Sequence, residues 1–136
     1  MNDIAECLIL IVDDTEASVD LLVAALEDSY ELAVALDGEA ALEVAEESQP
    51  NLILLDIVMP GMSGFEVCEK LRESSTTRSI PVMFLSGQAD DEDRERAVAL
   101  EAVGFIEKPF DVPALQRQVA GFLNKQSRAP QGDTHG

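Results

Sequence analysis

The stretch LILLDIVMPGMSG, residues 52–64, indicates a buried strand that leads through a short turn into a helix. Its first four residues are apolar without alternation, which is typical of a strand covered on both faces of its sheet. Pro60 and Gly61 mark the turn, and Ser63 with Glu66 three residues later forms the capping box that begins a helix. This order predicts a parallel βα unit.

Short apolar runs alternate with segments of helical period along the rest of the chain. We expect strands at Cys7 to Val12, Glu31 to Leu36, Leu52 to Leu55, Pro81 to Leu85 and Gly104 to Glu107. We expect helices at about 16–27, 39–48, 64–74, 91–101 and 112–124. The pattern predicts one α/β domain, a doubly wound (βα)₅ fold of the flavodoxin type. Its five-stranded parallel sheet should have the order 2-1-3-4-5.

Chain length limits the size of the fold, and net charge limits the classes of molecule that it can bind. The 136 residues suit a single core, and 27 acidic against 9 basic residues give a net charge of −18. That charge argues against direct binding to nucleic acid or to an anionic membrane. No apolar run is long enough for a signal peptide or a membrane span, so we expect a cytoplasmic protein. We place the domain at residues 1–125 and a disordered polar tail at 126–136.

Polar residues follow four of the predicted strands. Asp13 and Asp14 follow the first, Asp56 ends the third, Ser86 the fourth and Lys108 the fifth. In such sheets, ligands bind beyond the carboxyl ends of the strands where the strand order reverses. Three carboxylates about 4 Å apart would repel one another by roughly 4 kcal/mol per pair, so the cluster should recruit a cation. All-oxygen ligands favour Mg²⁺, with Mn²⁺ as an alternative.

A site of this kind can make one carboxylate nucleophilic toward a phosphoryl donor. The metal and Lys108 would neutralise charge on the transferring group, and Ser86 would donate a hydrogen bond to one of its oxygens. Asp56, the central acid, would then become an acyl phosphate. The only histidine, His135, lies in the polar tail, which leaves the chemistry to carboxylates, hydroxyls and lysine.

Four blocks of sequence resemble the receiver domains of bacterial response regulators, the phosphoacceptors of two-component signalling. They are LILIVDD at 8–14, LILLDIVMPGMSG at 52–64, FLSG at 84–87 and FIEKPF at 105–110. The resemblance implies that Asp56 is phosphorylated by a sensor histidine kinase or a phosphotransfer protein, without turnover as an enzyme. It also implies a cis bond between Lys108 and Pro109. The implied metal ligands are Asp13, Asp14, Asp56 and the backbone carbonyl of Val58.

The same resemblance implies a switch and its partners. Ser86 and Phe105 would move on phosphorylation and change the face formed by residues 91–101, 104–107 and 112–124. That face would control a downstream protein or output domain, or form a phosphorylation-dependent homodimer. The phosphohistidine donor would dock near Ala17 and Leu21. The sequence names neither the kinase nor the output, and the receivers it resembles most are those joined to cyclic-dinucleotide enzymes.

One departure and two alternatives accompany this interpretation. Receivers usually have a glycine where this chain has Glu101, so the loop after the fourth helix is expected to be stiffer or reshaped. A Mg²⁺-dependent phosphohydrolase of the haloacid-dehalogenase type is one alternative, but it needs an acid where Val58 stands. An unphosphorylated scaffold that binds partners constitutively is the other.

Overall fold

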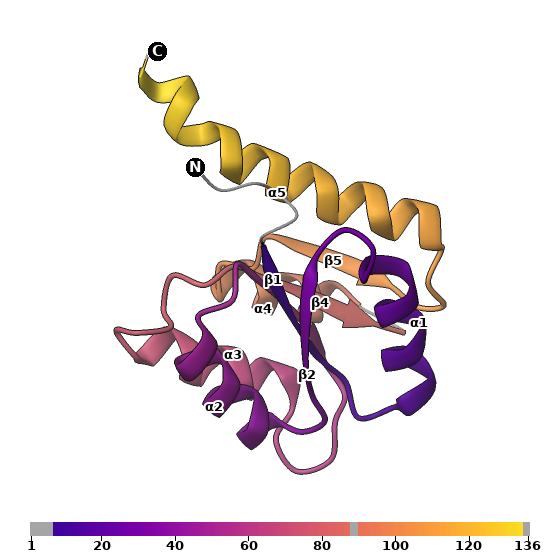
Figure 1. Cartoon of the computed structure of the whole chain (residues 1–136). Coiled ribbons are helices and arrows are strands. Elements are labelled where there is room, and N and C mark those ends of the chain that lie inside the picture. Colours follow the sequence, from indigo (N-terminus) through magenta and orange to yellow (C-terminus); the bar gives the residue numbers. More distant parts are fainter. Residues whose placement is uncertain (1–6, 88–89, 135–136) are drawn as a thin grey trace.

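The computed structural model describes residues 7–87 and 90–134, which form a sheet with helices on both sides (Figure 1). Strands and helices alternate throughout, as predicted, and most bounds lie within two residues of the expected ones. The strands are β1 (Leu8–Val12), β2 (Glu31–Ala35), β3 (Leu52–Asp56), β4 (Val82–Ser86) and β5 (Gly104–Glu107). The helices are α1 (Glu16–Leu26), α2 (Gly38–Ser48), α3 (Gly64–Glu73), α4 (Asp91–Ala99) and α5 (Val112–Thr134).

The sheet is fully parallel and has the order β2-β1-β3-β4-β5, which confirms the predicted topology. Every residue of β3 and β4 is buried, so the central strands are covered on both faces. This explains why LILLD at 52–56 lacks an alternating pattern. The strand order reverses between β1 and β3, at the edge where ligands bind in such folds.

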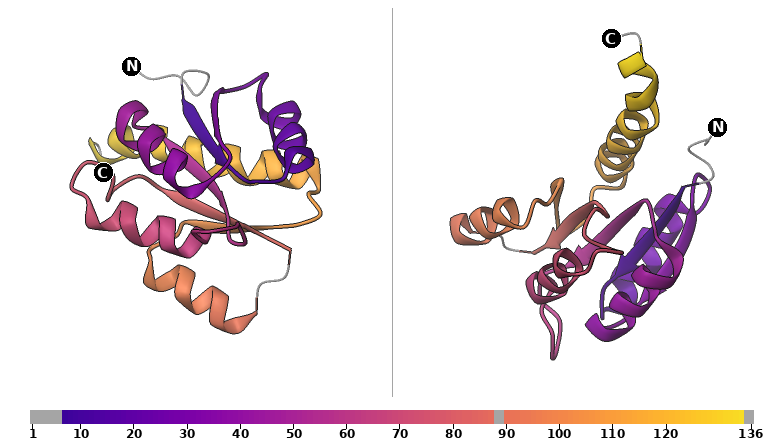
Figure 2. Two further views of the ribbon diagram at one scale, coloured as in Figure 1. Left: turned by 90° about the horizontal axis from the view of Figure 1, so that it is seen from below. Right: turned by 90° about the vertical axis from the view of Figure 1, so that its left-hand side faces the viewer.

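Two apolar cores cover the two faces of the sheet. On one face, side chains of α2 and α3 pack with Leu10, Leu55 and Phe84, and Ala97 joins them from α4. On the other face, α1 and α5 pack with Ile9 and Ile11. Figure 2 shows the helices on both sides of the sheet. Because residues 9 to 12 alternate between the two cores, they hold β1 firmly in the centre of the domain.

Two helices begin with a complete capping box, and the one at α3 was predicted. The backbone N–H of Glu66 donates to Ser63 Oγ at 3.2 Å, and the N–H of Ser63 donates to Glu66 Oε1 at 2.9 Å. Asp90 and Asp93 form the same reciprocal pair at the start of α4. Asp90 and Asp93 therefore have a structural role at the N-terminus of α4.

Helix α5 continues to Thr134, whereas we expected residues 126–136 to be a disordered tail. The expected end at 124 rested on the loss of apolar periodicity, and periodicity reports which residues pack on a core. Leu115, Val119 and Leu123 anchor the first part of α5 in the core, and a helix that is already formed can propagate beyond such an anchor. Residues 135–136 lie outside the described part of the chain. Within that part, no helix has the length and hydropathy needed to cross a bilayer.

Candidate functional site

Three carboxylates meet where β1 and β3 end. Asp13 and Asp14 directly follow β1, and Asp56 is the last residue of β3, which pairs with β1 in parallel. One oxygen of each carboxylate lies within 4.8 Å of the others. Asp13 is fully buried and Asp56 is 5% exposed, whereas Asp14 faces solvent. The predicted convergence of these acids at the carboxyl edge of the sheet is therefore present.

Lys108 reaches the two buried acids from the end of β5. Its Nζ lies 3.1 Å from Asp13 Oδ2 and 3.4 Å from Asp56 Oδ1. The backbone N–H of Lys108 donates to the carbonyl of Ser86 at 2.8 Å, which ties the end of β5 to the end of β4. The bond between Lys108 and Pro109 is cis, as the family resemblance implied. One ammonium thus bridges two carboxylates at a site with little solvent.

Backbone donors fix the orientation of the buried acids. The N–H of Thr15 donates to Asp13 Oδ1 at 2.9 Å, so both oxygens of this carboxylate have partners. A hydrogen bond from the backbone of Val58 reaches the Asp56 carboxylate. No sequence pattern predicts the contribution of Thr15, because it is a main-chain N–H that any residue except proline could supply.

Asp56 is an electrostatically strained carboxylate. Burial raises its pKa, the nearby Asp13 carboxylate raises it further, and the ion pair and hydrogen bond with Lys108 oppose the rise. The resulting pKa is about 6, compared with 3.8 for an unperturbed aspartate. Burial and repulsion by Asp13 both disfavour the ionised form of Asp56. A proton or a nearby cation would therefore stabilise this carboxylate.

The donor set of this cluster fits a small divalent cation. It offers three carboxylates from two adjacent strands, with no sulfur or nitrogen ligand among them, and hard oxygen donors are what Mg²⁺ selects. Asp14 is open to solvent, which leaves room for the waters that Mg²⁺ usually retains. The assignment of the Val58 carbonyl as a further ligand stays a prediction.

The two proposed switch residues lie on neighbouring strands. Ser86 ends β4 and is 5% exposed, and the register places Asp56 opposite Leu85, one residue away from it. Phe105 is half-buried in β5, opposite Phe84, and their ring centroids are 5.9 Å apart. Arg94 of α4 lies over the Phe105 ring, a contact between distant residues that the sequence analysis did not anticipate.

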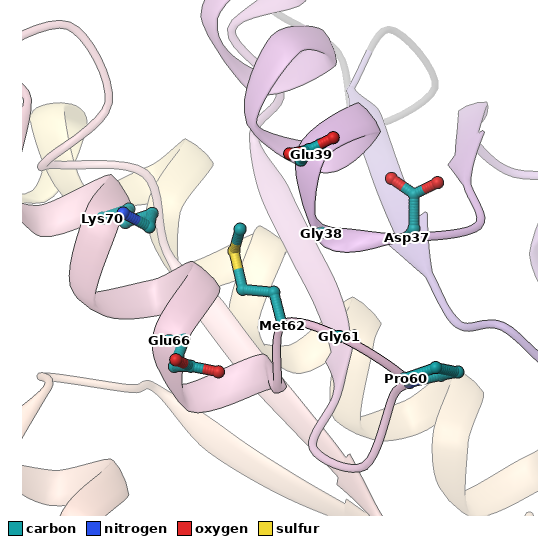
Figure 3. A pocket seen from close by; sticks show the side chains of 8 residues that line it. All are labelled: Asp37, Gly38, Glu39, Pro60, Gly61, Met62, Glu66 and Lys70. Atoms are coloured by element: carbon teal, nitrogen blue, oxygen red, sulfur yellow. The ribbon is translucent and has the colours of Figure 1, made fainter.

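A pocket of about 410 Å³ opens between the start of α2 and the β3–α3 loop (Figure 3). Its acidic side chains include Asp37, which caps α2, and Glu66, which caps α3. The hypothetical Cβ of an alanine at Gly38 would lie 3.0 Å from the sulfur of Met62, so the pocket wall is tightly packed there. Asp13, Asp14 and Asp56 do not line it. Asp37 and Glu66 serve helix capping, so we do not assign the predicted chemistry to this pocket.

Comparison with known proteins identifies the family of this chain. Residues 9–120 match the family model described as the response regulator receiver domain. A probable cyclic di-GMP phosphodiesterase from Vibrio cholerae is 39% identical over 129 residues, which are 94% of this chain and 29% of that protein. The DNA-binding transcriptional regulator RpaA from Synechocystis is 36% identical over 128 residues, which are 93% of this chain and 53% of that protein. The chain therefore spans about half or less of these relatives.

A solved structure with the same fold contains the expected ion. The receiver domain of a sensor histidine kinase from Pseudomonas aeruginosa has a magnesium ion coordinated in its active-site cleft. It matches with a TM-score of 0.79 and 26% identity, over 88% of this chain and 99% of that one. Receiver domains are signalling modules that bind Mg²⁺ in an acidic pocket, and Asp13, Asp14 and Asp56 form an acidic cluster in this chain. The chain belongs to the response regulator receiver domain family.

Proposed function

We propose that Asp56 accepts a phosphoryl group in a Mg²⁺-dependent reaction with a phosphohistidine donor, either a sensor histidine kinase or a phosphotransfer protein. The observation that carries this proposal is the meeting of three carboxylate oxygens within 4.8 Å, beside an ammonium that contacts two of the acids. In the reaction, an Asp56 oxygen attacks phosphorus, the new O–P bond forms, and the N–P bond of the donor breaks. The donor imidazole keeps the electron pair and leaves.

Each residue of the cluster has a role in this scheme. Asp13, Asp14 and Asp56, with the backbone carbonyl of Val58, would hold Mg²⁺ or Mn²⁺, which supplies positive charge to the transferring group. Lys108 would bind a phosphoryl oxygen and exchange part of its contact with Asp56 for that oxygen. Ser86 would donate its hydroxyl to another phosphoryl oxygen. Asp13 would hold Lys108 in place through the 3.1 Å ion pair.

Phosphorylation would act on a partner through the face of α4, β5 and α5. Movement of Ser86 toward the phosphoryl group would leave space for Phe105, and the balance between two arrangements of that face would shift. The partner would be a downstream protein or an output domain, and a homodimer through this face is a further prediction. The donor would dock near Ala17 and Leu21, which are both exposed on α1. We place this signalling in the cytoplasm.

A phosphotransfer experiment tests the proposal. The intact mass of the protein should increase by one phosphoryl group after incubation with a small phosphodonor and Mg²⁺, and the gain should vanish with a chelator. Asp56→Asn should abolish it, whereas Asp28→Asn should not, because Asp28 is exposed in the turn between α1 and β2. A mass gain that persists in Asp56→Asn would assign the phosphoacceptor to another residue.

The same assay separates the two alternatives. A phosphohydrolase would release phosphate repeatedly from a phosphomonoester, yet the Val58 side chain, which stands where its general acid would be, is apolar and 79% exposed. A constitutive scaffold would show no mass gain and no dependence of partner binding on Mg²⁺. Phosphotransfer profiling against purified kinases would then identify the physiological donor.

A further inference from the structure

Helix α4 has almost no apolar anchor. Ala97 is the only buried residue between Asp91 and Ala99, and Val98 on the outer side is 76% exposed. A helix of this length usually presents an apolar stripe to the core, and burying one alanine removes little surface from water. The views in Figure 2 show α4 at the margin of the molecule, beyond α3. Other contacts must therefore hold α4 against the domain.

Two arginines of α4 supply such contacts on opposite sides of the helix. Arg94 lies over the Phe105 ring at 5.2 Å from the centroid, and its Nη2 is 3.1 Å from Glu107 Oε2. Toward α3, the guanidinium of Arg96 lies 4.6 Å from the centroid of the Phe65 ring. Its Nη2 is 3.1 Å from Glu69 Oε2. We call each arginine, with its ring and its carboxylate, a bracket.

The two brackets differ in what they hold. Phe65 is buried in α3 and belongs to the fixed core, so the Arg96 bracket attaches α4 to an immobile support. Phe105 is half-buried and is the proposed aromatic switch, so the Arg94 bracket attaches α4 to a ring that moves. The carboxylate partners also differ, because Glu69 is on α3 and Glu107 is the last residue of β5.

We propose that the two arginine brackets hold α4 on the domain, and that Arg94 couples the release of α4 to the position of Phe105. The first half concerns the fold alone, and the second half rests on the proposed function. Arg94 is then a positioning residue that acts through Phe105. Each bracket combines a cation–π contact with a partly exposed ion pair. The two contacts of one bracket together change the opening equilibrium of the helix by up to about tenfold.

Hydrogen exchange measured by mass spectrometry tests the first half. In the unphosphorylated protein with a chelator, Arg94→Met and Arg96→Met should each speed exchange of peptides from α4 by about five- to tenfold. Methionine preserves the apolar stem and removes the charge. Glu107→Gln, which preserves the contact of Arg94 with the ring, should give only about a twofold effect. Arg78→Met, a change at an exposed arginine in the loop between α3 and β4, should have none.

Salt provides an independent measurement on the unmutated chain. At about 1 M NaCl, where charges are screened within about 3 Å, exchange in α4 should become faster in the wild type. The Arg94→Met/Arg96→Met double variant should show no such response in α4. Unchanged exchange in both single variants would overturn the proposal. Equal acceleration in peptides of β1 and β3 would also overturn it, because α4 would then open only with the whole domain.

Phosphorylation tests the second half. Phosphodonor and Mg²⁺ should speed α4 exchange in the wild type, and most of that difference should be lost in Arg94→Met, where the bracket to Phe105 is already open. An undiminished difference in Arg94→Met would refute the coupling. A wild-type protein that gains no phosphoryl mass would refute the proposed function, while the chelator experiment would still decide whether the brackets hold α4.

Discussion

Helix α3 follows the strand that ends in Asp56, and helix α4 follows the strand that ends in Ser86. Both helices begin with a complete capping box, so their N-termini are equally well specified. Their packing is very different, because α3 buries Gly64, Phe65, Val67, Cys68 and Leu71, whereas α4 buries only Ala97. The proposed phosphoacceptor is thus followed by a firmly packed helix, and the proposed switch hydroxyl by a weakly packed one. A signalling domain needs both, a site that keeps its geometry and an element that can move.

The largest expected effect compares one apolar truncation in each helix. Leu71→Ala should lower the free energy of unfolding by about 3 kcal/mol, because it leaves a cavity in the core shared by α2, α3 and the sheet. Val98→Ala should change it by less than about 0.5 kcal/mol, because that side chain is largely in water. Urea denaturation of both variants measures the difference. Similar losses would show that α4 has a hidden apolar anchor and would remove the contrast.

The packing of α3 illustrates what the sequence could predict. Apolar spacing, the Ser63 and Glu66 capping box and the unbroken run at 52–55 specified α3 and β3 because each signal is local. The meeting of Asp13, Asp14 and Asp56 was predictable because parallel strands present their carboxyl ends at the same edge. The roles predicted for Asp56, Lys108 and Ser86 followed from the chemistry of the cluster, and that of Phe105 came from family resemblance.

Features that depend on distant residues were not predictable. Arg94 and Arg96 appear as ordinary surface charges in a polar helix, and only the fold brings aromatic rings beneath them. The C-terminal bound of α5 was also missed, because the sequence of residues 125–134 has no apolar periodicity. The loosely packed helix was therefore the part that sequence patterns described least well.

A second prediction concerns the strained carboxylate at the end of β3. Because folding raises the pKa of Asp56 from 3.8 to about 6, the folded protein binds more protons than the unfolded one between these values, and stability falls as pH rises through this window. The full shift corresponds to roughly 3 kcal/mol, an upper limit for one carboxylate. With a chelator, Asp56→Asn should stabilise the protein by about 2 kcal/mol at pH 7.5 and have little effect at pH 4.

Magnesium is the control for this pH dependence. A cation near Asp56 favours the ionised form, so saturating Mg²⁺ should shrink the advantage of Asp56→Asn at pH 7.5. Urea denaturation at both pH values, with and without Mg²⁺, gives the four free energies needed. A variant that is less stable than the wild type at pH 7.5 without Mg²⁺ would contradict the raised pKa.

Loss of a capping box should destabilise α3 and α4 by similar amounts. The two losses should differ in their effect on the free energy of global unfolding. Ser63→Ala and Asp90→Ala each remove the side chain that accepts from an N3 backbone N–H, which costs about 1 kcal/mol. In α3 the loss should appear in the free energy of global unfolding. In α4 it should appear mainly as faster hydrogen exchange of the helix, because a weakly packed helix opens before the rest of the domain. Equal global losses would mean that α4 unfolds only with the core.

The smallest effect is expected at the end of α4, where this chain departs from its family. Glu101 has a φ of 64°, and the N–H of Ala102 reaches back to the carbonyl of Ala97 at 3.0 Å, which is a Schellman motif. The loop thus has the left-handed backbone conformation that glycine favours, although a glutamate stands there. Glu101→Gly should relieve this strain and stabilise α4 by about 0.5 kcal/mol, since part of the relief is offset by the entropy of glycine in the unfolded chain. Glu95→Gly, inside the same helix, should instead cost about 1 kcal/mol. Both changes remove one glutamate, so loss of a charge should affect them alike. Slower hydrogen exchange in α4 for Glu101→Gly and faster exchange for Glu95→Gly would therefore indicate relief of backbone strain at Glu101.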